Sequence, residues 1–382
     1  MANPPSAPRR TFAIAVAAAA AFALLVAAVV GIPRLVGDSS RAAPTTTATS
    51  AEVPAAPGAP RQPPTTAPPP EGLKEPIVGL LDRQGEPKAG YELSGWVVKS
   101  SWADLQPAAG GPIAEQNVID GAIVRARELG MVLKLRVYAG DQAPEWAKQL
   151  GGPPLTLVDP ADGGTSTIGR FWTEPFGRAY ADFQALLAAR YDGVAEIRET
   201  VISRCTTVFA EPFIRQTGAG ENLTTFGAAG LNDKTDQRCF EEQVDAHDVW
   251  KRTRSDLAVS PYQSVQAKAA ARDEGRAQRG GDLAIPEQVM RYCRERLGPR
   301  CVLENNSLRI EPRAQYEQLY EVMRGLGRPL AFQTATGDKV GDLAATISRA
   351  ADLGAASVEL PISYRKAPAS DLGPGVGRLS ST

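Results

Sequence analysis

Histidine is almost absent from this sequence. The chain of 382 residues contains one, His247, in a polar helical segment where we expect it to be exposed on the surface. A single histidine argues against a histidine-rich zinc site, a Ser-His-Asp triad and a histidine proton shuttle. If the chain is an enzyme, carboxylates are the side chains best suited to move its protons.

An excess of charge of either sign is also missing. Lysine and arginine number 42 against 43 aspartates and glutamates, so the formal net charge is −1. Because nucleic-acid binding depends on clustered lysine and arginine, this balance argues against a nucleic-acid partner. No Gly-x-Gly-x-x-Gly or Gly-x-x-x-x-Gly-Lys loop follows a strand-like run, and no Cys-x-x-Cys pair occurs. We therefore expect neither a cofactor nor a metal.

One long apolar run lies early in the sequence. Residues 11–32 carry no charge and follow Arg9 and Arg10. As a helix rising about 1.5 Å per residue, the run would reach about 33 Å, enough for a bilayer core of about 30 Å. By the positive-inside rule we expect a cytoplasmic segment 1–10, a single-pass anchor in the cell membrane and an extracellular body. A cleaved signal peptide with a secreted body is the alternative, and Arg9-Arg10 also resembles a twin-arginine export signal.

Two further segments have the composition of unfolded chain. Residues 33–74 are rich in proline, alanine and threonine and cannot bury enough apolar area to offset the entropy of ordering. We expect a disordered linker that holds the next domain away from the membrane. Glycine, proline and serine predict a flexible tail over 366–382. The folded domain then occupies 75–365.

All four cysteines lie beyond the apolar run. An even number of cysteines in an exported chain predicts disulfides. Cys293 and Cys301 flank a short turn between a helix and a strand, so they form the first expected pair, and Cys205 with Cys239 forms the second. A zinc site built from all four thiolates is the alternative.

Strand-like and helix-like runs alternate along the domain. The expected strands are 76–81, 95–99, 131–138, 201–209, 257–259 extending to 265, 301–303, 329–332 and 357–360. The expected helices are 114–129, 175–191, 241–253, 286–297, 313–326 and 343–353. Regular alternation predicts a parallel sheet, and eight strands over this length predict a (β/α)8 TIM barrel. An open doubly wound sheet is the alternative.

The ends of the expected strands carry polar and aromatic residues. Chemistry in such a barrel takes place at the carboxyl ends of its strands. Aromatic faces stack on sugar rings, and amides and carboxylates bind sugar hydroxyls. The candidate substrate-binding residues are Trp102, Arg136, Tyr138, Asp141, Trp146, Asn305, Asn306, Gln333 and Tyr364. This set predicts a glycan, such as a polysaccharide, as the ligand.

Four short motifs in order resemble a known family. They are Ser101-Trp102-x-x-Leu105-Gln106-Pro107, Ala143-Pro144-Glu145-Trp146, Ala189-Arg190-Tyr191 and Glu211-Pro212. Together they remotely resemble the barrel glycoside hydrolases of clan A, in particular the barrel β-galactosidase and cellulase-like branches. The resemblance implies that Glu211 is the general acid/base. The family usually has asparagine before this glutamate, whereas this chain has Ala210.

The second carboxylate is less clear. The family places a nucleophilic glutamate at the end of strand seven, where this chain has Gln333, an amide that cannot form the usual ester. Glu359, at the end of strand eight, lies opposite strand four in an eight-stranded barrel, and two inward carboxyls there suit the spacing of about 6.5–9.5 Å used by inverting glycosidases. Glu304 is a second candidate. Each of the three glutamates has a structural alternative, namely an ion pair with an arginine at the barrel mouth such as Arg136.

Two functions follow from these patterns. The first is an exported, membrane-anchored glycoside-hydrolase-like protein that acts on an extracellular or cell-envelope polysaccharide through Glu211. The second is a non-catalytic carbohydrate-binding barrel at the cell surface, which Gln333 favours.

Overall fold

Eight parallel strands close into a barrel in the computed structural model, which describes residues 72–161, 163–274 and 281–381. In chain order the barrel strands are β1 (Gly79–Asp82), β2 (Gly95–Ser101), β3 (Val132–Tyr138), β6 (Ile197–Val201), β7 (Arg254–Ala258), β8 (Cys301–Leu308), β9 (Leu330–Thr334) and β10 (Ala355–Leu360). β1 pairs with β10 and so completes the ring. The predicted TIM barrel is confirmed.

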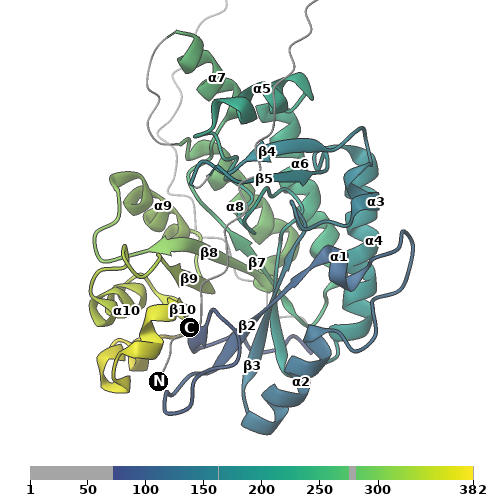
Figure 1. Cartoon of the computed structure of the whole chain (residues 1–382). Helices are drawn as coiled ribbons and strands as arrows, with labels where there is room; N and C mark the ends of the chain where they lie inside the picture. Colours follow the sequence, from purple (N-terminus) through teal and green to yellow (C-terminus); the bar gives the residue numbers. More distant parts are fainter. Residues whose placement is uncertain (1–71, 162, 275–280, 382) are drawn as a thin grey trace, which may run out of the picture. The chain divides into compact units, whose positions relative to one another are not determined.

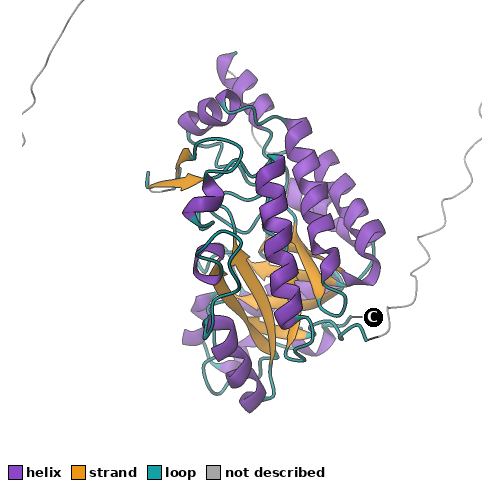
Figure 2. Cartoon of the chain, turned by 90° about the vertical axis from the view of Figure 1, so that its right-hand side faces the viewer, coloured by secondary structure: helices purple, strands orange, loops and turns teal. Residues whose placement is uncertain are grey.

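Helices surround the strands, as Figure 2 shows in purple around orange. The main ones are α2 (Val118–Leu129), α4 (Glu174–Tyr191), α6 (Asp233–Ala246), α8 (Ala284–Leu297), α9 (Ala314–Gly325) and α10 (Leu343–Asp352). Their starts follow local capping chemistry: Asn117 caps α2 and Asn232 caps α6, each in a reciprocal capping box. In the described chain β1 runs to β2 without a helix, through residues 83–94.

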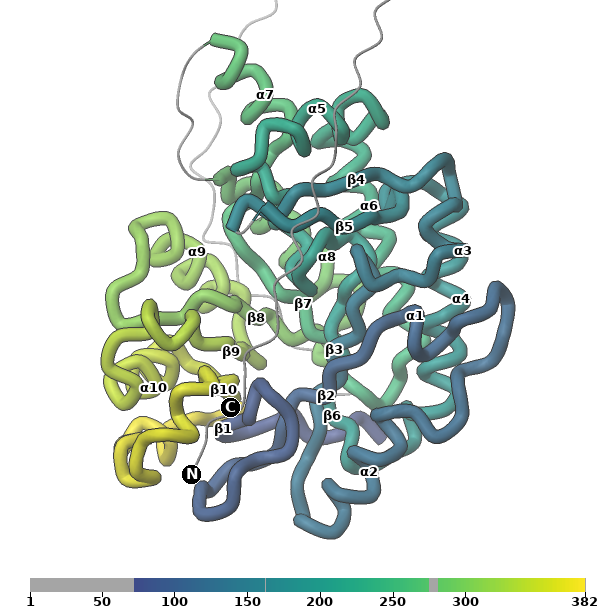
Figure 3. The backbone as a smooth tube through the Cα atoms, in the orientation of Figure 1, coloured from purple at the N-terminus to yellow at the C-terminus, as the bar shows by residue number. Residues whose placement is uncertain are grey.

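Additional elements follow three neighbouring strands. The hairpin of β4 (Leu155–Val158) and β5 (Thr165–Ile168) comes after β3, and α5 (Gly220–Ala228) and α7 (Val265–Asp273) come after β6 and β7. In Figures 1 and 3 these elements gather beyond one end of the barrel. Because each follows the carboxyl end of a strand, they build up one side of the face where barrel enzymes carry their chemistry.

Short helical pieces complete the described chain. They are α1 (Trp102–Leu105), α3 (Glu145–Lys148) and the 3₁₀ turns η1 (His247–Val249), η2 (Gly298–Arg300), η3 (Ile362–Lys366), η4 (Ala369–Leu372) and η5 (Val376–Arg378). The last two lie in the expected flexible tail. Leu372 and Leu379 of this segment are buried, and the Ser380 N–H donates to Ala355 O, so the described part of the tail packs on the barrel instead of fraying.

The fourth strand differs from the sequence-based expectation. We predicted 201–209, but β6 ends at Val201. The residue of β6 that faces the barrel interior is Glu199, which forms an ion pair with Lys134. The segment therefore lacks the alternation of apolar residues by which a strand is recognised in a sequence. The extension of the fifth strand to 265 is likewise wrong, since β7 ends at Ala258 and α7 begins at Val265. The helix expected over 241–253 begins earlier, at the Asn232 cap, and ends at Ala246.

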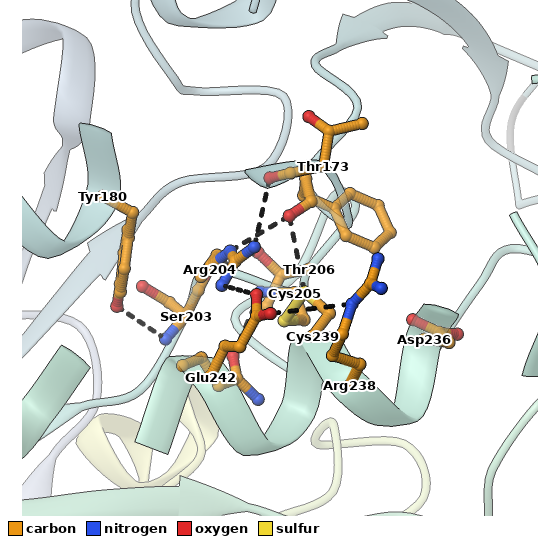
Figure 4. Close-up of a disulfide and its surroundings, with 12 residues drawn as sticks. Thr173, Tyr180, Ser203, Arg204, Cys205, Thr206, Asp236, Arg238, Cys239 and Glu242 are labelled. Carbon is orange, nitrogen blue, oxygen red and sulfur yellow. Dashed lines mark hydrogen bonds and ion pairs between the residues drawn. A yellow bond between two sulfur atoms is a disulfide. The ribbon is translucent and has the colours of Figure 1, made fainter. Parts of the chain in front are cut away.

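Both predicted disulfides are confirmed. Cys205 bonds Cys239, and Cys293 bonds Cys301. Figure 4 shows the first bridge joining the segment after β6 to α6. Beside it, the Arg204 guanidinium pairs with Glu242 of α6 at 2.8 Å and donates to the carbonyls of Phe171 and Thr173. The bridge and these contacts fix the chain between β6 and the carboxylate at Glu211.

His247 is a correction to the expected surface position. The residue is completely buried at the end of α6, where its Nε2 lies 3.0 Å from the Tyr180 hydroxyl and its Nδ1 lies 3.2 Å from the Ser255 hydroxyl. Burial lowers the pKa of His247 to about 3. The imidazole is therefore a neutral part of the core.

The expected cytoplasmic segment 1–10, the anchor 11–32 and nearly all of the linker 33–74 lie outside the described residues. Among the helices that are described, none is both long and apolar enough to cross a bilayer.

Candidate active site

A cluster of charges fills the middle of the barrel. Lys134 of β3 is fully buried, and its Nζ lies 2.5 Å from Asp256 Oδ2, 2.7 Å from Glu304 Oε1 and 2.9 Å from Glu359 Oε1. A fourth carboxylate, Glu199, lies 3.9 Å away. These side chains come from β3, β6, β7, β8 and β10, so a single ammonium group links much of the ring.

Arg136 lies two residues further along β3 and therefore faces the same interior. Its Nη1 and Nη2 donate to Glu359 Oε2 at 2.9 Å and to Glu359 Oε1 at 2.7 Å. Nη1 also donates to Gln333 Oε1 at 2.9 Å. Burial alone would raise the pKa of Glu359, but Arg136 and Lys134 together hold it well below its usual range. Glu359 is thus an ionised carboxylate beneath the mouth of the barrel.

The other interior carboxyls have raised pKa values. Burial raises the pKa of Glu304 well above its usual range, and nearby Asp256 and Glu359 add to this effect. Burial also raises the pKa of Asp256, and it raises that of Glu199 to about 7. The raised pKa values favour the protonated form at these three carboxyls, in contrast to Glu359.

Glu211 lies in the segment between β6 and α5, ten residues beyond the strand end where we had expected it. It still reaches the barrel mouth. The Ser260 hydroxyl, just past β7, donates to Glu211 Oε2 at 3.3 Å, and the side chain of Asn306 on β8 also hydrogen-bonds Glu211. Burial raises the pKa of Glu211, although both hydrogen bonds and the charge of Arg136 oppose the shift. In the described chain Glu211 has no ion-pair partner, and the residue is partly buried.

Two cations border the same opening. Arg83 follows β1, and its Nη1 donates to Thr334 O at the end of β9 at 2.7 Å. Lys99 of β2 is in register with Arg136 of β3, and its Nζ donates to Gln84 Oε1 at 3.3 Å. Both side chains are half-exposed, as is Tyr138 at the end of β3. Arg83 and Tyr138 each interact electrostatically with Arg136, Glu359 and Glu211, which places these five groups around one site.

The two tryptophans predicted to bind sugar lie elsewhere. Trp102 is fully buried on α1, packs against Phe176, Tyr180 and Phe183, and donates its indole N–H to Gln106 Oε1. It has no free face for a ligand. Trp146 of α3 packs edge-on against Trp102 and lines a cavity of about 740 Å³ between α3 and α4, on the outer flank of the barrel.

Three more predicted binding residues have structural contacts. Asn305 is buried and bonds Val259 O and the Tyr320 hydroxyl. Tyr364 is buried, and its hydroxyl donates to Asp82. Asp141 is half-buried after β3, and its backbone N–H donates to Thr207 O. The structure therefore brings Arg136, Tyr138, Asn306 and Gln333 to the site, together with Glu211, Glu304 and Glu359.

Sequence reasoning missed four residues of the site. They are Arg83, Lys99, Lys134 and Ser260. Lys134, Arg136 and Tyr138 alternate in β3 and so share its inner face, a signal that the sequence already contained. Arg83 and Ser260 lie in loops, and only the folded chain brings them to the mouth.

The carboxylate cluster has the oxygen ligands that a metal would use, but Lys134 Nζ occupies the position between them. Within residues 72–161, 163–274 and 281–381, no group of three or more potential ligands is arranged to hold a metal ion. The positive charge that the interior carboxylates need comes from Lys134 and Arg136.

Comparison with known proteins gives matches among solved structures. The chain matches no family model, and it matches no curated protein sequence. The β-amylase catalytic domain of Paenibacillus polymyxa has 10% identity and a TM-score of 0.46, over 80% of this chain and 96% of that one. Endo-glycoceramidase II of Rhodococcus sp. has 14% identity and a TM-score of 0.44, over 77% and 76%. An endo-β-1,4-xylanase of Gloeophyllum trabeum has 12% identity and a TM-score of 0.45, over 74% and 84%.

The remote resemblance to barrel glycoside hydrolases that the sequence motifs indicated is thus found again among solved structures. At these identities and TM-scores the likeness concerns the barrel alone.

Proposed function

We propose that this barrel hydrolyses glycosidic bonds of an extracellular or cell-envelope polysaccharide, with Glu211 as the proton donor to the leaving oxygen. The observation that carries the proposal is the setting of Glu211. Its carboxyl is partly buried at the mouth, has no ion-pair partner in the described chain and has a raised pKa. A general acid must carry its proton when the substrate is bound, and a raised pKa favours that state.

A second carboxyl, whose pKa is lowered, supports the proposal. The pKa of Glu359 is lowered by Arg136 and Lys134, while that of Glu211 is raised by burial. Two carboxyls driven apart in this way suit glycoside cleavage, in which one donates a proton and the other supplies negative charge to the cation-like transition state. In this assignment Glu304 keeps Lys134 in place, with its Oε1 2.7 Å from the ammonium.

The remaining polar groups at the mouth suit a sugar ligand. Tyr138 and Gln333 are half-exposed there, and the carbonyl oxygen of Asn306 is buried with no hydrogen-bond partner among the described residues. A sugar hydroxyl would supply the donor that this oxygen lacks, and hydroxyls make such bonds readily.

Export and anchoring belong to the same proposal. Two disulfides in the described chain are typical of proteins that fold in an oxidising compartment. We propose that residues 11–32 anchor the protein in the cell membrane with the barrel outside, and that cleavage of this segment would instead release a secreted form. Detergent extraction and amino-terminal sequencing of the mature protein separate the two.

A non-catalytic glycan-binding barrel is the second candidate, and specific contacts favour it. Both oxygens of Glu359 are engaged by cations, and the residue is 1% exposed, so it reaches neither water nor substrate without a rearrangement. The neighbouring strand end offers Gln333 and no carboxylate.

Hydrolysis by the full chain on a panel of glycans tests the proposal. Glu211→Gln removes the acidic proton at nearly unchanged shape, and we expect a fall in kcat/KM of about 100-fold or more, because general acid catalysis contributes about 10²–10⁴-fold. Glu145→Gln is the matched control, since Glu145 is exposed on α3. Full activity of Glu211→Gln contradicts the assignment. Binding without hydrolysis by the native protein favours the second candidate.

A further inference from the structure

We infer that the site accepts an anionic glycan, and that Arg83 and Lys99 hold its acidic group, a carboxylate, sulfate or phosphate on a sugar next to the cleaved bond. This inference rests on the proposed function, because it specifies the substrate class of the same site. It starts from the observation that, among the described residues, neither of the two cations at the mouth has a carboxylate within ion-pair distance.

The guanidinium of Arg83 has N–H donors that its hydrogen bond to Thr334 does not use. Its Nη1 donates to the carbonyl of Thr334, which fixes the guanidinium against the end of β9. Throughout the described chain no carboxylate lies within ion-pair distance of it. A guanidinium presents five N–H donors in a fixed plane, which suits two-point contact with a carboxylate, sulfate or phosphate.

Lys99 reaches the same opening from the neighbouring strand. Its Nζ contacts the neutral Gln84 Oε1 at 3.3 Å and, in the described residues, no carboxylate within ion-pair distance. Because Lys99 is in register with Arg136 on adjacent parallel strands, both side chains project from the same face of the sheet. The positive charges of Lys99 and Arg136 therefore lie side by side at the carboxyl ends of β2 and β3.

The nearby carboxylates are already occupied. Asp82 binds Arg365 at 2.6 Å and accepts the Tyr364 hydroxyl, and Glu359 is shared by Arg136 and Lys134. Burial lowers the pKa of both Lys99 and Arg83; the charge of Arg136 adds to this shift, and the charge of Glu359 opposes it without cancelling it. A ligand anion would relieve this crowding.

The acid that the mechanism uses does not supply that charge. A protonated Glu211, which proton donation requires, is neutral and does not neutralise the two cations. Nor does it repel an incoming anion. In the state that donates the proton, the mouth thus combines a neutral acid with two cations that have no ion-pair partner among the described residues, an arrangement that favours an acidic sugar over a neutral one.

A paired glycan array with the full chain in nonionic detergent tests the inference. Each neutral oligosaccharide is printed beside derivatives of the same linkage that are carboxylated, sulfated or phosphorylated at C6. We expect at least one acidic derivative to bind about tenfold more tightly than its neutral partner at low salt, since hydrogen bonds to charged groups are the stronger class. The preference should shrink as salt is raised.

Substitutions assign the effect to the two residues. Arg83→Gln and Lys99→Gln should each reduce the preference about five- to tenfold, and the double variant should bind acidic and neutral glycans alike. Arg83→Lys and Lys99→Arg keep the charges and should retain most of the preference. Arg291→Gln, on the exposed face of α8, is the control and should change nothing.

The outcomes are distinct. Equal binding of acidic and neutral glycans by the native protein, or an unchanged preference in the double variant, overturns the inference, while hydrolysis of neutral glycans leaves the proposed function standing. Absence of binding to every pair on the array overturns the inference, and absence of hydrolysis with an intact charge preference overturns only the catalytic proposal. The identity of the preferred derivative separates carboxylate, sulfate and phosphate.

Discussion

Acidification should destabilise the fold through its single histidine. His247 is fully buried between Tyr180 and Ser255, and its pKa is lowered to about 3 by burial. In the unfolded chain a histidine has a pKa of about 6.5. The unfolded state therefore takes up a proton as the pH falls below about 6.5, whereas the folded state stays neutral until about pH 3.

The sign and the size of the change in the free energy of unfolding follow from this difference in pKa. A histidine whose pKa is lowered by folding contributes its full share of stability above about pH 6.5 and loses it progressively as the pH falls. Each pH unit below 6.5 costs about 1.4 kcal/mol, so the free energy of unfolding should lose about 3 kcal/mol from His247 alone at pH 4.5. This is a large fraction of the stability of a typical domain, about 5–15 kcal/mol.

Urea unfolding of the native protein and of His247→Gln between pH 7 and 4.5 measures the effect. Glutamine offers a donor and an acceptor to Tyr180 and Ser255 but does not titrate in this range. The carboxylates common to both proteins titrate alike, so their contribution cancels in the difference of the two unfolding free energies. That difference should shrink by about 3 kcal/mol on acidification. Parallel pH curves for the two proteins would refute the reasoning and imply that the imidazole becomes protonated within the fold.

Three further outcomes are expected. Lys134→Met leaves the buried carboxylates without their common cation and should lower the free energy of unfolding by about 3–5 kcal/mol in urea, whereas Arg127→Gln, which breaks an exposed pair with Glu196, should leave it nearly unchanged. Replacing both cysteines by serine should cost about 4 kcal/mol for Cys205–Cys239, whose sequence separation is 34, and about 2.5 kcal/mol for Cys293–Cys301, whose separation is 8; free thiols by mass spectrometry in unreduced native protein would contradict both bridges. Because Glu211 must be protonated and its pKa is raised, kcat/KM should fall as the pH rises through a value above the usual carboxyl range, and a pH profile unchanged in Glu211→Gln would contradict its role.

The elements predicted well are those whose periodicity and end signals agree. The helix expected over 313–326 is α9, and the one over 286–297 is α8, each within two residues at either end. Gly130, Gly327 and Gly354, which follow helices in the sequence, all have positive φ in the structure. Glycine adopts this backbone conformation without steric cost, so its position after a periodic run marks the end of a helix.

The interior of the barrel limited the prediction of strands. Strand assignment relies on apolar residues, but the inner face of β6 carries Glu199 and that of β7 carries Asp256. Their partner Lys134 lies more than sixty residues earlier in the chain. A buried charged residue whose partner is so far away in the chain cannot be told from an exposed loop residue in the sequence alone. The fourth strand was therefore predicted at the next apolar run.

The same long-range pairing decides which glutamates can react. Glu211, Glu304 and Glu359 are equivalent in the sequence, each near the end of a strand or expected strand. The ring brings Lys134 and Arg136 into ion pairs with Glu304 and Glu359, whereas Glu211 has hydrogen bonds from Ser260 and Asn306 and no ion pair in the described chain. Glu211 is therefore the candidate proton donor at the mouth, whereas Glu304 and Glu359 belong to the buried cluster around Lys134. Among the described residues, Lys134 and Arg136 are engaged by this cluster, whereas Arg83 and Lys99 at the rim have no carboxylate within ion-pair distance, and for this reason we infer a negatively charged substrate.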